Sequence, residues 1–125
     1  MGSAQTAVVL LGHGSRVEDA NRGLRAVARS VAAQLGVETV EAAFLQFATP
    51  TLEEAASACV AAGARRVAVV PFFLFSGAHV LEDIPAALAR LRRRFPDVEF
   101  RLSPVLGGHP KLAEAAAERV KEVLG

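Results

Sequence analysis

Residues 6–16 read TAVVLLGHGSR, an apolar run that stops abruptly at a glycine-rich turn. The run from Thr6 to Leu11 is continuous and rich in β-branched residues, which is typical of a strand buried on both faces of a sheet. From Glu18 to Leu35, apolar residues recur every three or four positions, and Gly36 follows as a helix stop. These residues therefore predict a β-strand, a turn and an amphipathic α-helix.

The same order of strand and helix returns three more times along the chain. Strands are predicted over Val37–Phe47, Arg66–Phe75 and Val98–Leu102, and helices from after Thr49-Pro50-Thr51 to Gly63, over Leu81–Phe95, and from Pro110 nearly to Gly125. Pro71 lacks an N–H, so we expect the third strand to end or bulge there. Repeated β-α units join parallel strands by right-handed crossovers. The pattern predicts an α/β fold: a three-layer sandwich with a four-stranded parallel sheet, flavodoxin-like, in which the first and third strands, the most apolar, are central.

The composition fits one compact globular domain over residues 1–125. Hydrophobic residues make up 52% of the chain and charged residues 22%, enough for a core and unlike a disordered chain. A net charge of +1 argues against nucleic acid as a partner. The basic stretch Arg90–Arg94 ends a predicted helix, where the helix dipole favours cations, so we expect it to be a solvated helix end.

The chain has one cysteine, Cys59, so it cannot form an intrachain disulfide. This favours a reducing compartment, and we expect Cys59 to be a small buried apolar residue. The first residues lack the pattern of a signal peptide, and no apolar run is long enough to cross a membrane. The expected location is the cytoplasm.

All three histidines follow predicted strands: His13 the first, His79 the third and His109 the fourth. Open α/β sheets bind ligands beyond the carboxyl ends of their strands. Neighbouring strands lie about 5 Å apart, so the imidazoles of His13 and His79 could converge on one metal ion. Imidazole suits cobalt, nickel, iron and zinc, and it can accept a proton near neutral pH. A lone histidine more often caps or fixes a loop, and His109, directly before Pro110, is assigned that structural role.

The turn Gly12–Ser15 is open to another interpretation. Its glycines and the helix start that follows suit a bound anion. The chain lacks both the G-x-G-x-x-G fingerprint and the P-loop, so a nucleotide is not expected. It also lacks the G-x-S-x-G elbow of a hydrolase nucleophile, and we expect Ser15 to cap the helix.

Three stretches together carry a resemblance to a known family: LGHGSR at 11–16, AFLQFATP at 43–50 and VPFFLFSGAHVLEDIP at 70–85. In this order they resemble the short class II tetrapyrrole chelatases of the sirohydrochlorin cobaltochelatase and ferrochelatase type. The resemblance implies ATP-independent insertion of divalent cobalt, nickel or iron, as a substrate, into sirohydrochlorin or a related tetrapyrrole. It also implies a homodimer, in which His13 and His79 bind the metal and accept the protons of the ring as catalytic residues.

The tetrapyrrole implied by this resemblance carries many carboxylates. Arg16 and the backbone N–H groups of Gly14 and Ser15 could bind some of them. Gln46 and Gly77, in the second and third stretches, complete the predicted substrate-binding set. Three phenylalanines follow Pro71 and could face the ring, although we expect at least two of them to pack in the core: Phe72, Phe73 and Phe75.

Gln46 departs from the family pattern, because many relatives carry a glutamate there. An amide is a weak metal ligand and no base. The departure therefore implies either lower activity or that the histidines take over metal binding and proton uptake from the missing carboxylate. Glu41, five residues away on a strand, points to the opposite face. Glu82 and Asp83 are expected to cap a helix, with a hydrogen bond to a histidine as the less favoured alternative. The rival functions are a non-catalytic metal- or tetrapyrrole-binding protein, and a phosphate-binding enzyme that uses Gly12–Ser15.

Overall fold

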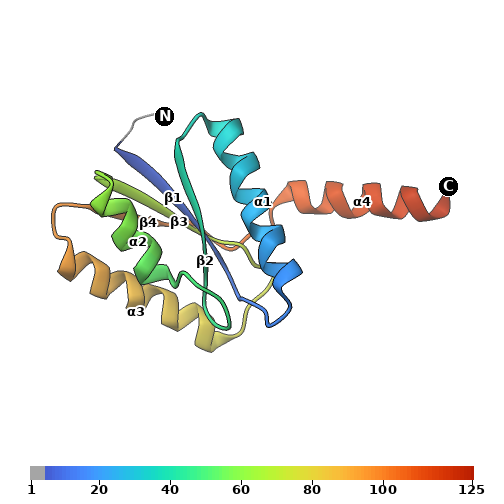
Figure 1. Cartoon of the computed structure of the whole chain (residues 1–125). Coiled ribbons are helices and arrows are strands. Elements are labelled where there is room, and N and C mark those ends of the chain that lie inside the picture. Colours follow the sequence, from blue (N-terminus) through green and yellow to red (C-terminus); the bar gives the residue numbers. More distant parts are fainter. Residues whose placement is uncertain (1–4) are drawn as a thin grey trace.

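The computed structural model describes residues 5–125; residues 1–4, part of the start examined for a signal peptide, lie outside the described residues. The strands are β1 (Thr6–Gly12), β2 (Thr39–Phe44), β3 (Arg66–Pro71) and β4 (Glu99–Leu102), and the helices are α1 (Glu18–Leu35), α2 (Leu52–Ala61), α3 (Ala78–Arg94) and α4 (Pro110–Leu124). All strand pairs are parallel, in the order β2-β1-β3-β4 (Figure 1). The predicted α/β fold, with the first and third strands central, is confirmed.

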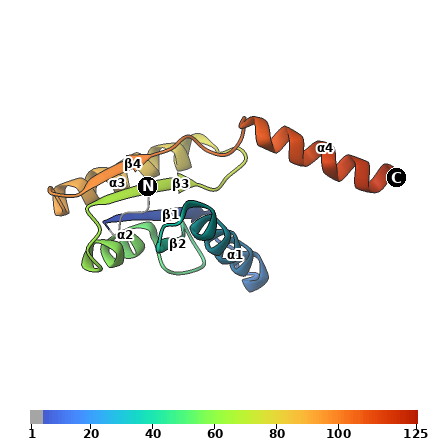
Figure 2. The same ribbon diagram turned by 90° about the horizontal axis from the view of Figure 1, so that it is seen from above.

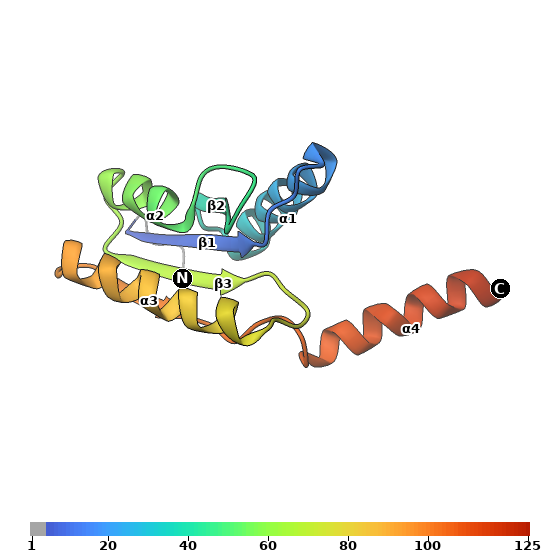
Figure 3. The same ribbon diagram turned by 90° about the horizontal axis from the view of Figure 1, so that it is seen from below.

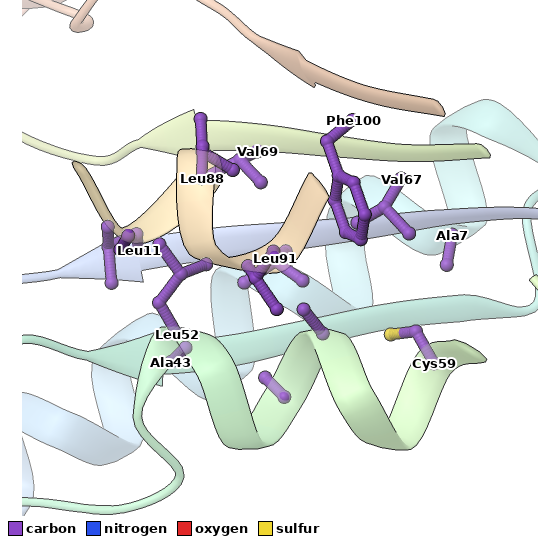
Figure 4. Packing of buried hydrophobic residues seen from close by; sticks show 14 of the residues in the cluster. Ala7, Leu11, Ala43, Leu52, Cys59, Val67, Val69, Leu88, Leu91 and Phe100 are labelled. Carbon is purple, nitrogen blue, oxygen red and sulfur yellow. The ribbon is translucent and has the colours of Figure 1, made fainter. Parts of the chain in front are cut away.

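The sheet separates two hydrophobic cores, which makes three layers. The larger core lies between the sheet and the helices α2 and α3, and Figure 4 shows Leu52, Leu88 and Leu91 of these helices meeting residues of β1, β3 and β4. The smaller core joins α1 to the other face of β1 and β2. Cys59 is buried in the larger core, as predicted. Burial is the main reason that the pKa of its thiol rises to about 11, with Glu41 adding to it.

The element ends follow local chemistry. Gly36 ends α1 with a left-handed φ of 66°. Thr51 begins α2 with a capping box, in which its side chain accepts from the Glu54 N–H and the Glu54 carboxylate accepts from the Thr51 N–H. β3 ends at Pro71, as its missing N–H predicts.

Two predicted boundaries are wrong. β2 ends at Phe44 rather than Phe47, because the chain turns at once and Phe47 takes a left-handed φ of 64°. α3 begins at Ala78 rather than Leu81, because the extended Gly77 serves as N-cap and the helix starts directly behind it. His79 therefore lies in the first turn of a helix and not in a loop.

The last helix corrects the expectation of a compact globule. α4 begins at Pro110 as predicted, yet it contains no buried residue and extends away from the rest of the molecule (Figures 2 and 3). The layers are formed by α1 on one face and by α2 and α3 on the other. No helix within residues 5–125 is long and apolar enough to cross a membrane.

Candidate functional site

The loops that follow the four strands interlock at the carboxyl edge of the sheet. The Leu45 N–H donates to the Gly12 carbonyl at 3.0 Å, which joins the loops after β1 and β2. The Gly107 N–H, after β4, donates to the Phe73 carbonyl, after β3, at 3.2 Å. A Cβ on Gly107 would lie 1.5 Å from the Leu74 carbonyl oxygen, so only glycine allows this approach. The edge is thus a closely connected surface.

His13 is the first residue after β1, as predicted, and its side chain is exposed. Its imidazole stacks on the buried Phe73 ring, with 4.1 Å between the ring centroids and an interplanar angle of 28°. It lines two cavities, one toward α2 and α3 and one toward α1. The stacking fixes the plane of the imidazole while its edge stays open to a ligand.

Gly14 and Gln46 are brought together by the backbone. The Gln46 N–H donates to the His13 carbonyl at 3.1 Å, and Gly14 has a φ of 88°. A Cβ on Gly14 would lie 1.7 Å from the Gln46 carbonyl oxygen. Gly14 therefore has a structural role that is separate from its predicted contact with substrate.

Ser15 is held by a residue that the sequence did not single out. Asn21 is only 2% exposed; its Oδ1 accepts from the Ser15 N–H at 3.0 Å, and its Nδ2 donates to the Ser15 carbonyl at 2.8 Å. The predicted helix cap is wrong: Val17 is the N-cap of α1 without a side-chain cap, and the Ser15 Oγ accepts from the Val17 N–H at 3.0 Å. Because Asn21 takes the Ser15 N–H, that group is not free for a substrate carboxylate.

Arg16 projects over an aromatic ring of the neighbouring loop. Its guanidinium lies 4.5 Å from the ring centroid of Phe47, which is 54% exposed. A guanidinium on a ring face keeps its N–H groups at the edge available to an anion. The exposed cation is therefore positioned beside the His13 loop by the loop after β2.

The cavity toward α2 and α3 has a volume of about 490 Å³ and contains most of the polar groups of the site. His13 and Gln46 line it together with two carboxylates, Glu53 and Asp83. Glu53 is paired with Arg90, whose Nη2 lies 2.6 Å from its Oε1, so Arg90 is more than a solvated helix end. Asp83 forms no ion pair or hydrogen bond among residues 5–125. It lies in the second turn of α3, so its predicted capping role is wrong, as is that of Glu82.

His79 and Gly77 lie at the start of α3. The His79 side chain is exposed and is not among the residues that line either of the cavities lined by His13. Within the described part of the chain, no group of three or more His, Cys, Asp or Glu side chains is placed to hold a metal ion. Convergence of His13 and His79 on one ion therefore stays a prediction.

The phenylalanines after Pro71 correct another expectation, because only Phe73 is buried. Phe72 is 37% exposed and Phe75 is 82% exposed. Two aromatic side chains at the carboxyl edge are thus available to a flat apolar ligand. The Oγ of the nearby Ser76 is buried without a hydrogen-bond partner within residues 5–125.

His109 has the structural role that was predicted for it. It is the N-cap of α4, and its Nδ1 accepts from the Lys111 N–H at 3.1 Å. This hydrogen bond occupies the Nδ1 lone pair at the start of the helix. His109 therefore has a different role from His13 and His79.

The fold and the site define a class: α/β proteins with an open imidazole at the carboxyl edge of a parallel sheet, between two cavities and beside exposed aromatic rings. The chain belongs to the CbiX family, whose model matches residues 7–123. It is 34% identical to the sirohydrochlorin ferrochelatase of Bacillus subtilis over 94% of this chain and 45% of that protein. It is 33% identical to the sirohydrochlorin cobaltochelatase of Methanopyrus kandleri over 95% of this chain and 97% of that protein.

Solved structures agree with this membership. A CbiX protein of cobalamin (vitamin B12) biosynthesis from Marinobacter aquaeolei VT8 superposes with a TM-score of 0.83 at 29% identity, over 95% of this chain and 97% of that one. The sirohydrochlorin chelatase SirB from Bacillus subtilis subspecies spizizenii, in complex with cobalt, gives a TM-score of 0.86 at 33% identity, over 95% of this chain and 51% of that one. The chain spans about half the length of the first curated relatives it matches.

Proposed function

We propose that the protein inserts a divalent metal ion, cobalt, nickel or iron, into sirohydrochlorin or a related tetrapyrrole without ATP. The observation that carries the proposal is His13, an exposed imidazole that stacks on Phe73 and lines a cavity together with Gln46 and Asp83. Relatives across nearly the whole chain are named sirohydrochlorin ferrochelatase and cobaltochelatase. The metal is a substrate in this proposal, and residues 1–125 act as one chelatase domain in the cytoplasm.

The proposed mechanism needs a metal ion held loosely and a base for the two N–H protons that the ring loses. The lone pairs of the neutral imidazoles of His13 and His79 bind the incoming metal. Once the four ring nitrogens have replaced them as ligands, the same lone pairs accept the two protons that the ring loses. The exposed rings of Phe72 and Phe75 face the macrocycle, and Arg16 binds one of its carboxylates. Gly14 and the exposed Gly77 have no side chain, so the tetrapyrrole can approach the backbone at both positions and can contact the Gly14 N–H.

Asp83 supplies the carboxylate that Gln46 does not. It lines the cavity of His13, and the other carboxylate there, Glu53, is already paired with Arg90. An anionic group near the metal favours its entry and accepts a proton, whereas an amide does neither. We expect Asp83→Asn to slow insertion by about tenfold to a hundredfold. The measurement is the initial rate of the absorbance change as sirohydrochlorin takes up cobalt.

The neighbouring carboxylate gives a matched control for Asp83. Glu82→Gln removes the same charge one residue earlier on α3, outside the cavity, and should leave the rate unchanged. Equal rates for Asp83→Asn and the unaltered protein would remove Asp83 from the mechanism.

Gln46→Glu is expected to raise the insertion rate by about tenfold or more, because it adds an anionic base to the same cavity. The rate is compared with that of Gln34→Glu, which makes the same change at an exposed position of α1. A rate that stays the same or falls in Gln46→Glu would show that this position contributes no missing chemistry.

The proposal as a whole is tested with the purified chain, sirohydrochlorin and cobalt. The visible spectrum should change faster than in a mixture without protein, and without added nucleotide. An equal rate would defeat the chelatase proposal. Tight binding of metal or tetrapyrrole without acceleration would instead establish the non-catalytic binding protein as the function.

We also infer that two copies of the chain associate. Support comes from the family resemblance, which implies a homodimer. A flat tetrapyrrole on the carboxyl edge of one copy would keep one side in water, and a second copy can cover it.

A further inference from the structure

Arg16 is a cation without a counter-charge at the carboxyl edge of the sheet. Its side chain is exposed, and its guanidinium forms no ion pair or hydrogen bond within residues 5–125. The two carboxylates nearest to it in the sequence are already paired within α1, Glu18 with Arg25 at 2.5 Å and Asp19 with Arg22. The charge of Arg16 is therefore available to an anion from solution.

Phe47, whose ring faces this guanidinium, has a conformation that its residue type disfavours. Its φ of 64° lies in the left-handed region, which a bulky side chain rarely adopts. Its ring is 54% exposed and belongs to neither hydrophobic core of the described chain. Neither backbone preference nor burial thus accounts for a phenylalanine here. The position does provide a ring face 4.5 Å from the Arg16 guanidinium, and residues with such backbone strain cluster at functional sites.

The loop that carries Phe47 is fixed on both sides of the ring. The Phe44 N–H donates to the Pro50 carbonyl at 2.9 Å, which closes the loop. The Gln46 N–H donates to the His13 carbonyl at 3.1 Å, which ties it to the loop after β1. The ring therefore has a set position relative to the His13 loop.

Asn21 fixes the backbone from which Arg16 projects. Its side chain accepts from the Ser15 N–H at 3.0 Å and donates to the Ser15 carbonyl at 2.8 Å. The first group belongs to the peptide unit between Gly14 and Ser15, and the second to the unit that ends at the Arg16 nitrogen. Because peptide units are planar, these two hydrogen bonds set the direction in which the chain enters Arg16. Asn21 is only 2% exposed, so its amide is held in place by packing.

Arg16 is thus held at its backbone by Asn21 and at its guanidinium by Phe47. A side chain that is already ordered loses less conformational entropy when it binds a ligand. The ring covers one face of the guanidinium and leaves the N–H groups at its edge free, in the planar arrangement that matches a carboxylate. Sirohydrochlorin, the tetrapyrrole of the proposed function, carries such groups around its ring.

We propose that Phe47 and Asn21 are positioning residues, which hold Arg16 as a preformed subsite for a carboxylate at the edge of the tetrapyrrole. Arg16 contacts the substrate, and the two other residues act through it. The inference rests on the tetrapyrrole substrate of the proposed function. It does not depend on metal insertion, because the subsite binds the ring before any metal enters.

Arg16→Met is expected to weaken the binding of metal-free sirohydrochlorin by about tenfold or more, because it keeps the stem and removes the charged donor. The dissociation constant is measured from the absorbance change as protein is added to sirohydrochlorin. Binding to the unaltered chain should also weaken more steeply with added salt than binding to Arg16→Met. Equal dissociation constants for the two proteins would overturn the proposal.

Arg94→Met is the matched control. Arg94 is also an exposed arginine over a phenylalanine, 5.0 Å from the Phe95 ring centroid, but it ends α3 and is outside both cavities of His13. Its removal changes the net charge by the same amount and should leave the dissociation constant unchanged. A loss equal to that of Arg16→Met would reduce the effect to overall charge and overturn the subsite.

Phe47→Gly separates positioning from a purely structural role. Glycine tolerates the left-handed φ, so the urea midpoint should stay the same or rise. Sirohydrochlorin binding should nevertheless weaken by about threefold or more, because the ring no longer holds Arg16. Phe47→Tyr keeps the ring and should restore binding. A lower midpoint in Phe47→Gly with unchanged affinity would make Phe47 structural only and overturn its assignment.

A double-mutant cycle tests whether the positioning residues act through Arg16. In a chain that already carries Arg16→Met, neither Phe47→Gly nor Asn21→Ala should weaken sirohydrochlorin binding further. If Asn21→Ala does not fold, the cycle with Phe47→Gly decides. Losses that simply add would show that these residues act independently of Arg16 and would overturn the proposal.

These titrations contain no metal, so they separate the subsite from the proposed chemistry. A protein that binds sirohydrochlorin through Arg16 but does not accelerate insertion would refute the chelatase activity alone. A protein that inserts metal and binds sirohydrochlorin equally well with Arg16→Met would refute the subsite alone.

Discussion

Replacing His13 with alanine is expected to slow metal insertion by about 10²–10⁴-fold, the range that a placed proton acceptor contributes. In the proposed mechanism the substitution removes a metal ligand and a base together, and it leaves the buried Phe73 ring without its stacking partner. The imidazole is exposed, so the fold should survive. Initial rates with cobalt and sirohydrochlorin, and cobalt affinity by calorimetry, measure the two losses.

His109→Asn is the control, because asparagine also caps helices and position 109 is outside both cavities of His13. It should insert metal at the unaltered rate. His79→Ala completes the test of the predicted pair of ligands. If it keeps full rate and affinity while His13→Ala loses both, the pair is wrong and His13 works without His79.

Gly14→Ala should lower the free energy of unfolding by about 2–5 kcal/mol, through a strained left-handed backbone and overpacking. The φ of 88° disfavours any side chain, and the new Cβ would lie 1.7 Å from the Gln46 carbonyl oxygen. That oxygen belongs to backbone, which cannot rotate away as a side chain can. Because the loop after β1 and the loop after β2 must move apart, the rate of metal insertion should fall as well. Urea denaturation gives the stability and the insertion assay gives the rate.

Gly23→Ala is the counterpart, because its Cβ would meet nothing within 4 Å and its helical backbone suits alanine. It should stabilise the protein by about 0.5–1 kcal/mol. Equal stabilities of Gly14→Ala and the unaltered chain would mean that the loop after β1 relaxes without cost.

Much of the fold could be predicted, because the sequence features that specify its strands, helices and helix ends are local. The apolar run of β1, the stop at Gly36 and the cap at Thr51 each act within a few residues of chain. Repetition of strand and helix then leaves few topologies, and the parallel order with β1 and β3 central follows. The three histidines could be assigned to the carboxyl edge for the same reason.

The site could be predicted only in part. The place of His13 after an apolar strand predicts a site residue, whereas the sequence pattern predicts only a helix cap at Asp83, because the cavity that Asp83 lines depends on how α3 packs beside α2. Asn21 gave one usable signal, a polar residue on the apolar side of an amphipathic helix. Its partner, the backbone of Ser15, could not be identified from the pattern.

The sequence by itself determined the α/β class, the order of elements and the position of His13, since periodicity, caps and breakers act over short distances. Only the tertiary structure decided that the Gln46 carbonyl lies against Gly14 and that Asp83 lines the cavity of His13. These features join segments far apart in the chain. Packing between such segments depends on the shapes of whole surfaces, which no local pattern encodes.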